Sequence, residues 1–239
     1  MRVKTRDLLG FWIGTIAFGV VLGLPGCQST APDTAHVSRD PKSAIVDPSK
    51  LHPVTPAMRS GADAVAGRPA PAFSLPDTTG KLTTLKTAGA GKPLLVYFIN
   101  DGCPCCVTAE PLVERIAKTY AGAVQVIGVI NANAARGTAW QKANGLTFPL
   151  LLDPKMATIQ AYGALNGVYM AVVAPNGQLD HLYPGYSQDG LRELSARLAK
   201  LAGIPTREFD VQDAPTKPTS GCAFEFAVPE GPTSVSTKS

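Results

Sequence analysis

The feature that most constrains the fold of this chain is the cysteine cluster Cys103-Pro104-Cys105-Cys106, which directly follows a short apolar run. That run, residues 94–99, is bounded by turn-forming residues, a pattern typical of a strand buried on both faces. After the cysteines, apolar residues recur at helical spacing up to Tyr120, and Gly122 ends the helix. The cluster is therefore predicted to lie where a buried strand gives way to a helix N-terminus.

This position suggests chemical roles for the cysteines. Unpaired N–H groups and the helix dipole at a first turn stabilise a thiolate. Pro104 suits that turn because its missing N–H costs nothing there. Cys103 and Cys106 can close a disulfide, whereas the adjacent Cys105 and Cys106 could do so only with strain. We therefore predict an exposed, attacking Cys103 thiolate and a resolving Cys106, the catalytic pair of a disulfide exchange.

The chain from residue 67 to residue 203 alternates between strand and helix patterns. The sequence predicts strands at 124–130, 148–152, 168–173 and 178–183, and helices at 136–144, 155–162 and 188–201. Asn176-Gly177, between the last two strands, is a hairpin signal. Strand-helix-strand followed by hairpin-helix implies an α/β fold with a central mixed β-sheet flanked by helices.

The first 27 residues carry a targeting pattern. A basic start precedes the uncharged apolar run 8–24, and Leu24-Pro25-Gly26-Cys27 follows, the order of an export signal. Its ending resembles a bacterial lipobox, which implies lipidation of Cys27. The alternatives are an uncleaved membrane anchor, for which the run is barely long enough, and soluble secretion. In each case the domain lies outside the cytoplasm, and we expect a cell-envelope protein anchored by an N-terminal lipid.

Two flanking segments lack apolar periodicity. Residues 28–66 are proline-rich and are predicted to form a disordered tether, because they could not bury enough surface to offset their ordering entropy. Residues 204–239 look similar, apart from an apolar patch around Cys222 in which Phe224 and Phe226 could dock on the domain. The folded part is thus predicted to be a single domain, residues 67–203.

Composition narrows the function. The net charge is +4, and the basic residues are scattered rather than clustered, so we expect no nucleic-acid partner. No Ser-His-Asp order, zinc-type cysteine pairs or phosphate loop is apparent in the sequence. The cysteine cluster is therefore the leading candidate site.

Residues 67–203 resemble the redoxin branch of the thioredoxin superfamily, the AhpC/TSA and TlpA-like proteins. The resemblance rests on the entry segment 71–81, the step from Phe98 to Cys103, Pro111 after the cysteines, and the landmarks 148–153 and 174–177. It implies a thioredoxin-like fold with an N-terminal hairpin extension. It also implies a thiol-disulfide oxidoreductase without a cofactor, which exchanges disulfides with protein thiols or disulfides in the cell envelope.

Three positions depart from the family pattern. Gly102 replaces a tryptophan, Tyr97 stands where thioredoxins keep a buried acid, and Val168 replaces the cis-proline that faces the disulfide. In the family that proline shapes substrate docking and keeps metal away from the cysteines. Its replacement argues against a general reductase and makes metal binding easier.

Two other functions stay open beside an inert structural relative. One is a copper-binding module that uses Cys103, Cys106 and His181, by analogy with Sco-type proteins, because soft thiolates suit Cu(I). His36 and His52 fall in the predicted tether. The other is a divergent peroxidase, although the Thr or Ser that peroxiredoxins place three residues before the reactive cysteine is missing.

Cys105, Cys222 and Glu110 are auxiliary candidates. If Cys27 is lipidated, four thiols remain, which permits two disulfides. Cys222 is then a structural staple, an idle thiol or a disulfide partner of the cluster, foremost of Cys105, and Cys105 could also be a spare thiol or a metal ligand. Glu110, one turn past the cysteines, could assist proton transfer, but a solvated helix surface is its expected environment.

Overall fold

The computed structural model describes residues 52–226, all of which belong to one compact unit. The predicted export signal, Cys27 and residues 28–51 of the predicted tether lie outside the described residues, as does the chain beyond Phe226. Within the described part, no helix has both the length and the apolar character needed to span a bilayer.

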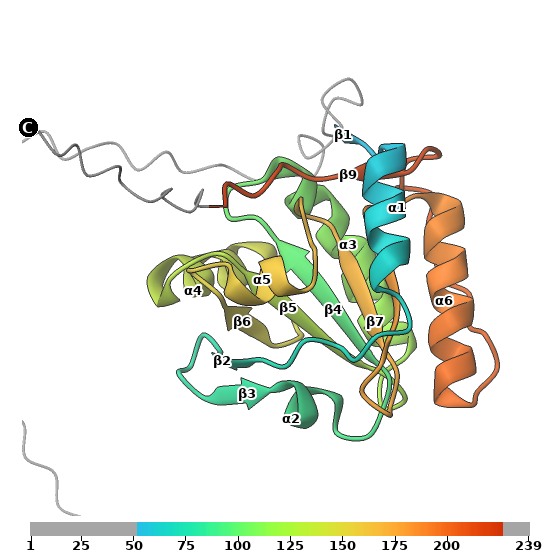
Figure 1. The fold of residues 1–239 in the computed structure, drawn as a ribbon, viewed down its shortest axis with the longest axis horizontal. Coiled ribbons are helices and arrows are strands. Elements are labelled where there is room, and N and C mark those ends of the chain that lie inside the picture. The colour runs from blue at the N-terminus through green and yellow to red at the C-terminus, as the bar shows by residue number, and fades with distance from the viewer. Residues whose placement is uncertain (1–51, 227–239) are drawn as a thin grey trace, which may run out of the picture. The chain divides into compact units, whose positions relative to one another are not determined.

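A five-stranded mixed sheet forms the centre of the fold, in the order β6-β5-β4-β7-β8 (Figure 1). Its strands are β4 (Leu94–Ile99), β5 (Gln125–Ile130), β6 (Leu150–Leu152), β7 (Met170–Val173) and β8 (Leu179–Tyr183). The first three run parallel to one another, while β7 pairs antiparallel with β4 and β8 pairs antiparallel with β7. The predicted mixed sheet is confirmed, and β4, which leads into the cysteines, is its central strand.

Helices cover both faces of this sheet. One face, here called the α3 face, packs against α3 (Pro104–Thr119), α6 (Gln188–Ala202) and Trp140 of α4 (Ala134–Asn144). The other, the α1 face, packs against α1 (Pro56–Val65), α2 (Leu85–Gly89) and α5 (Ala157–Ala161). Every residue of β4 is buried, because alternate side chains enter the two cores. This explains why β4 is apolar throughout rather than alternating.

The predicted N-terminal hairpin is also present. Strands β2 (Ser74–Pro76) and β3 (Leu82–Thr84) pair antiparallel, with Ser74 opposite Thr84. Asp77 turns the chain between them by accepting hydrogen bonds from the backbone N–H groups of Thr79 and Lys81.

The junction that carries the cysteines forms as predicted. Helix α3 begins at Pro104, so Cys103 is its N-cap residue, with φ −75° and ψ 117°. Cys105 and Cys106 occupy the first turn, and Pro111 lies inside the helix. The cluster therefore stands where the unpaired N–H groups of α3 are concentrated.

The predicted tether is wrong for residues 52–65, where the chain forms strand β1 (His52–Pro53) and helix α1. Thr55 caps the helix by accepting a hydrogen bond from the N–H of Met58 at 3.2 Å, and Pro56 occupies its first turn. Ala62 is buried in the α1 face. The sequence prediction took the prolines as signs of disorder, but a proline in the first turn starts a helix.

The predicted tether-like tail is also wrong as far as Phe226. Val211 and Ala214 are buried in the core of the α3 face, and strand β9 (Thr219–Ser220) pairs antiparallel with β1. Phe224 is buried and Phe226 packs beside it, which confirms the predicted docking of the apolar patch. The buried apolar residues of the tail are few and irregularly spaced, so the sequence of this segment shows no apolar periodicity from which packing could be predicted.

A paired substitution tests the revised start of the domain. Ala62, on α1, is buried. Its neighbour Gly61 is exposed, and no atom lies within 4 Å of the place that a Cβ at Gly61 would take. We expect Ala62→Asp to lower the free energy of unfolding by about 1–3 kcal/mol, because an uncompensated carboxylate enters the core. Gly61→Asp should cost clearly less. Urea unfolding of both variants measures the two changes in the free energy of unfolding. Equal decreases would mean that α1 does not pack on the domain and would favour the sequence-based prediction of a tether.

Candidate active site

The three cysteines of the cluster are buried, with exposed fractions of 2% for Cys103, 1% for Cys105 and 0% for Cys106. All three are free thiols, as is the half-buried Cys222. The prediction that Cys103 is exposed is therefore wrong. The reason lies in the C-terminal tail, which brings the N–H of Cys222 to 3.2 Å from Cys103 Sγ.

Hydrogen bonds from neighbouring thiols make Cys103 the anion of the cluster. The thiols of Cys105 and Cys106 donate hydrogen bonds to the sulfur of Cys103, and these two bonds lower its pKa most. The side chain and the backbone N–H of Cys222 donate as well and lower the pKa less. Together they hold the pKa of Cys103 far below its ordinary value, although burial alone would raise it. The same bond to Cys103 raises the pKa of Cys105, and burial raises the pKa of Cys106. Burial likewise raises the pKa of Cys222 to about 11. Of the four thiols, Cys103 is therefore the one whose surroundings favour the thiolate, and the surroundings of the other three favour the protonated form.

A tight backbone turn faces Cys106. A Cβ atom at Gly167 would lie 2.6 Å from Cys106 Sγ, so only glycine fits there. Val168, the next residue, has φ +66°, a strained value for a β-branched side chain, and its N–H bonds to the carbonyl of Phe98 at 2.9 Å. No peptide bond in the described residues is cis. Val168 therefore lies in the loop opposite the cysteines, as the family alignment predicted. The loop is shaped by the positive φ of Val168 and not by a cis peptide bond.

The tail crosses the site as a segment that continues from β9 and makes an isolated antiparallel bridge between Ala223 and Asn166. Gly221 N–H bonds to the carbonyl of Gly167 at 2.8 Å, and Gly167 N–H bonds to the carbonyl of Cys222 at 2.9 Å. The side-chain amide of Asn100 donates to the carbonyl of Ala223 at 2.8 Å. Gly221 is required by the close approach, since a Cβ there would lie 2.7 Å from the Gly167 carbonyl oxygen. These bonds place Cys222 directly over Cys103.

Glu110 lies inside the core, and the expectation of a solvated helix surface is wrong. Its exposed fraction is 2%, and the indole N–H of Trp140 donates to its carboxylate. Burial raises the pKa of Cys106 and of Tyr97 most, and the neighbouring cysteines raise it further. The charge of Glu110 makes a smaller contribution in the same direction. The hydroxyl of Tyr97 donates to the carbonyl of Cys106 at 3.1 Å. A buried carboxyl thus lies near the resolving cysteine, supplied by α3 rather than by position 97.

His181 does not join the cysteines. It lies on β8, where its ring contacts Tyr183 edge-on at 4.4 Å between centroids, and burial followed by the charge of Arg197 lowers its pKa. Among residues 52–226, the ligand atoms that converge belong to His52, Cys105 and Cys222 instead. Sequence reasoning missed His52 because it assigned that residue to the tether.

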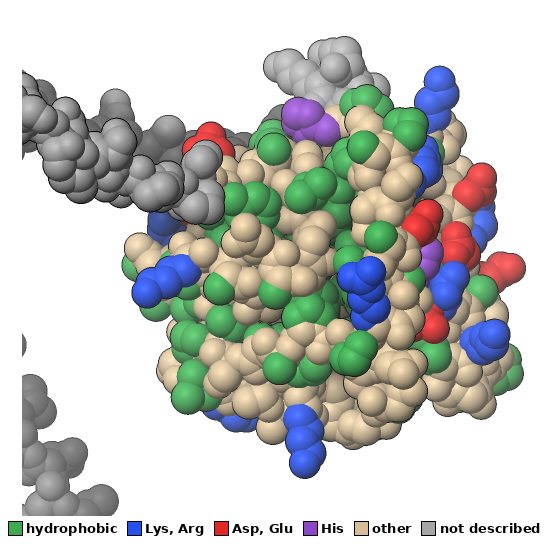
Figure 2. Space-filling model, in the orientation of Figure 1, with side chains coloured by type: hydrophobic (Ala, Val, Ile, Leu, Met, Phe, Trp, Pro, Cys, Tyr) green, Lys and Arg blue, Asp and Glu red, His purple; other side chains and the backbone are tan. Residues whose placement is uncertain are grey.

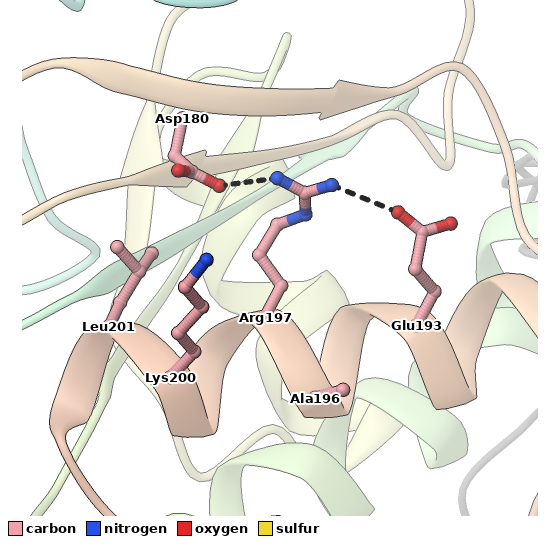
Figure 3. A pocket seen from close by; sticks show the side chains of 6 residues that line it. All are labelled: Asp180, Glu193, Ala196, Arg197, Lys200 and Leu201. Carbon is pink, nitrogen blue, oxygen red and sulfur yellow. Dashed lines mark hydrogen bonds and ion pairs between the residues drawn. The ribbon is translucent and has the colours of Figure 1, made fainter.

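A separate hollow between β8 and α6 serves packing rather than chemistry. Its polar lining is centred on Arg197, which donates to Asp180 at 2.9 Å and to Glu193 at 3.0 Å (Figure 3). The guanidinium is therefore neutralised in place and fastens α6 to the sheet. On the face drawn in Figure 2, basic side chains are scattered rather than gathered in one patch.

Comparison with known proteins identifies the domain. The AhpC/TSA family model matches residues 66–181. The thioredoxin-like protein YneN of Bacillus subtilis is 33% identical over 93 residues, which are 37% of this chain and 54% of YneN. The thiol-disulfide oxidoreductase ResA of Halalkalibacterium halodurans is 27% identical over 137 residues, 56% of this chain and 77% of ResA.

A Mycobacterium tuberculosis protein named as a peroxiredoxin is 31% identical over 100 residues, 41% of this chain and 63% of that protein. The match to this protein, like the match to YneN, therefore covers less than two thirds of the relative's own length. The resemblance thus concerns the domain around the cysteines.

Solved structures show the same fold. A conserved protein from Geobacillus kaustophilus superposes with a TM-score of 0.56 at 20% identity, covering 70% of this chain and 94% of that one. A structure from Chlorobium tepidum, titled as a thiol:disulfide interchange protein DsbE, superposes with a TM-score of 0.53 at 21% identity, covering 58% and 98%. At these identities the likeness concerns the fold alone, and it confirms the thioredoxin-like architecture. The domain that presents Cys103 and Cys106 at a strand-to-helix junction thus has a thioredoxin-like fold, and residues 66–181 within it match the AhpC/TSA family model.

Proposed function

We propose that the protein is a thiol-disulfide oxidoreductase of the cell envelope that exchanges disulfides between partner proteins and the pair Cys103–Cys106. The observation that carries this proposal is the place of Cys103 at the N-cap of α3 with Cys106 in the first turn beside it, where hydrogen bonds from the neighbouring thiols hold the pKa of Cys103 far below its ordinary value. The names of ResA and YneN point to the same class of chemistry.

The exchange proceeds in two displacements. The Cys103 thiolate attacks one sulfur of a partner disulfide, forming a mixed disulfide and releasing the other partner sulfur as a thiolate, which takes up a proton. Cys106 then loses its proton and attacks Cys103 Sγ, and the second partner sulfur leaves. The pair ends as a disulfide, and two electrons have passed to the partner. Run in reverse, the same steps oxidise partner thiols.

The second displacement needs a group that accepts the Cys106 proton. Burial keeps Cys106 protonated, and bulk water does not reach its fully buried sulfur. Glu110 is the carboxyl whose charge acts on Cys106 within the core. Glu110 is buried on the same helix as Cys106, one turn further along, and we propose that its carboxylate accepts this proton.

The tail must open before a partner can reach Cys103. The sulfur is covered by Cys222, and backbone bonds at Gly167 hold the cover in place. A partner chain that displaced the tail would find the same free N–H and carbonyl of Gly167 that the tail now uses. We propose that the described closed arrangement is the resting state and that exchange requires release of the segment around Cys222.

The envelope location rests on the N-terminal pattern of charged start, apolar run and Cys27. Fatty-acid labelling of the protein in a bacterial host should depend on Cys27. Labelling that persists in Cys27→Ser would place the lipid elsewhere, and no labelling of the native chain would favour the uncleaved anchor or secretion.

Serine variants separate the two cysteine roles. Cys106→Ser should accumulate a mixed disulfide with insulin or another disulfide protein, because Cys103 attacks and no resolving thiol follows. Cys103→Ser should form none and should lose turnover by at least about 100-fold, since no low-pKa thiolate remains. Gel electrophoresis without reductant and an insulin-reduction assay measure both. Unchanged turnover in Cys103→Ser would refute the proposal.

Because its pKa is lowered, Cys103 is expected to remain a thiolate at mildly acidic pH. The ordinary cysteine pKa is about 8.5, so a group with a strongly lowered value stays ionised well below pH 7 and is protonated only as the pH falls through that lowered value. Thiolate absorbance at 240 nm should therefore persist near pH 6 in the reduced protein and be missing in Cys103→Ser. Absorbance that rises only above about pH 8 would contradict the assigned charge.

A glycine substitution tests the cover. Gly221→Ala places a Cβ against the Gly167 carbonyl, so the tail should detach and Cys103 should be alkylated by iodoacetamide severalfold faster. Gly61→Ala, where no atom lies within 4 Å, is the matched control and should leave the rate unchanged. Equal rates in both variants would mean that the tail does not limit access.

The peroxidase alternative draws on the mycobacterial relative named as a peroxiredoxin. Against it, Asn100, three residues before Cys103, uses its amide to hold the tail rather than to polarise a peroxide. Peroxide consumption by the reduced protein should accordingly be slow. Rapid consumption that depends on one cysteine would favour that alternative.

A further inference from the structure

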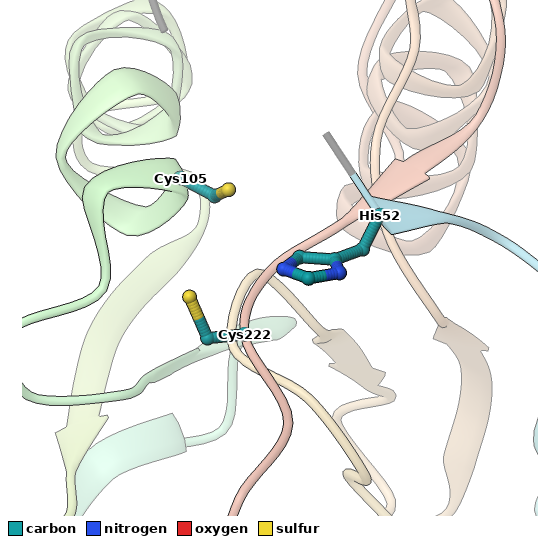
Figure 4. Close-up of side chains that lie close together, drawn as sticks. All are labelled: His52, Cys105 and Cys222. Atoms are coloured by element: carbon teal, nitrogen blue, oxygen red, sulfur yellow. The ribbon is translucent and has the colours of Figure 1, made fainter. Parts of the chain in front are cut away.

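We propose that His52, Cys105 and Cys222 form a binding site for a thiophilic metal ion of the Cu(I) or Zn(II) class. One imidazole nitrogen and two sulfur atoms from these residues lie within 4.8 Å of one another. In Figure 4 the ring of His52 and the two thiols point into one common space. This set differs from the predicted copper ligands, with which it shares no residue.

The fold brings the three ligands together from distant parts of the sequence. His52 comes from β1, which pairs with β9 so that His52 stands opposite Ser220. Cys222 follows β9 by two residues and is held by the bond from Gly167 N–H to its carbonyl. Cys105 lies in the first turn of α3. Each ligand is thus placed by backbone pairing or a helix, so the site is preorganised.

The donor types select the ion. Two sulfurs and one imidazole suit soft and borderline ions such as Cu(I) and Zn(II), whereas Mg²⁺ and Ca²⁺ require oxygen ligands, and the group contains no carboxylate. Cu(I) is satisfied by three such ligands. Zn(II) takes four, so a donor from outside this group would complete its shell.

Access and burial fit an ion that enters from solvent. His52 is exposed and Cys222 is half-buried, while Cys105 is 1% exposed and forms the inner end of the site. As the metal–sulfur bonds form, the two thiol protons leave and no electrons are transferred. A bound ion would tie the tail to α3 and keep Cys103 covered, so metal binding at Cys105 and Cys222 would block disulfide exchange at Cys103 and Cys106.

Titration of the reduced full-length protein, purified in detergent under anaerobic conditions, tests the site. Cu(I) is added in competition with bathocuproine disulfonate, and Zn²⁺ in competition with a pyridylazo dye. We expect one ion per chain. His52→Ala and Cys222→Ser should each weaken binding at least about 100-fold, more than is typical for loss of an outer-shell partner. His181→Ala, which removes the histidine of β8, is the matched control and should bind as the native chain does.

The ligand set itself is read by X-ray absorption of the metal-loaded protein. One nitrogen near about 2.0 Å with two or three sulfurs near about 2.3 Å is the expected shell for Zn(II). A shell of sulfur alone, or affinity unaffected by His52→Ala, would overturn the site and place the ion on Cys103 and Cys106. The test uses reduced protein and no disulfide substrate, so its failure is distinct from failure of the exchange reaction, which the Cys103→Ser turnover assay reports.

Discussion

The buried thiolate of Cys103 is the interaction on which the rest of this structure depends. A charged sulfur with an exposed fraction of 2% would be costly without compensation. Here the thiols of Cys105, Cys106 and Cys222 surround it as donors, and the start of α3 adds its unpaired N–H groups. The first turn of the helix, the loop at Gly167 and the tail are thus organised around one charge. Cys103 Sγ, the atom that accepts these hydrogen bonds, is also the nucleophile of the proposed disulfide exchange.

Local patterns in the sequence were sufficient to predict the sheet and the position of the cysteines. The apolar run of β4, the helical spacing of α3 and the turn at Asn176-Gly177 each report on contacts made within a few residues. Their arrangement in a mixed sheet then follows from general rules of chain connection. Cys103 and Cys106 could be found because strand, helix cap and cysteines are adjacent in the chain.

The parts that sequence reasoning missed depend on long-range contacts. His52 approaches the cysteines only because β1 pairs with β9, which is more than 160 residues away in the chain. The local sequence places Glu110 on a helix surface, but in the fold the indole of Trp140, from α4, packs over it and donates to its carboxylate. Thr55 and Pro56 did carry a local signal, a capped helix start, but the neighbouring prolines obscured it. Burial of Cys103 could not be predicted, because the cover comes from the far end of the domain.

Segments outside the family match reach the cysteines and complete their surroundings. The matched region ends at residue 181, whereas the tail that covers Cys103 and the strand that carries His52 lie beyond its two ends. The proposed control of partner access and the proposed metal site thus both rest on elements that lie outside the matched region. If exchange requires the tail to open, as proposed, a partner chain must replace the backbone bonds that the tail makes to Gly167.

The central claim is that Cys103 and Cys106 form a reversible redox couple, and its most direct test is thiol labelling with mass spectrometry across a dithiol redox series. The account predicts a single two-electron transition that joins Cys103 to Cys106, and its midpoint would assign the direction of exchange. If both thiols stay reduced across the series, or if Cys103 pairs only with Cys222, the exchange reaction proposed for this site would be contradicted.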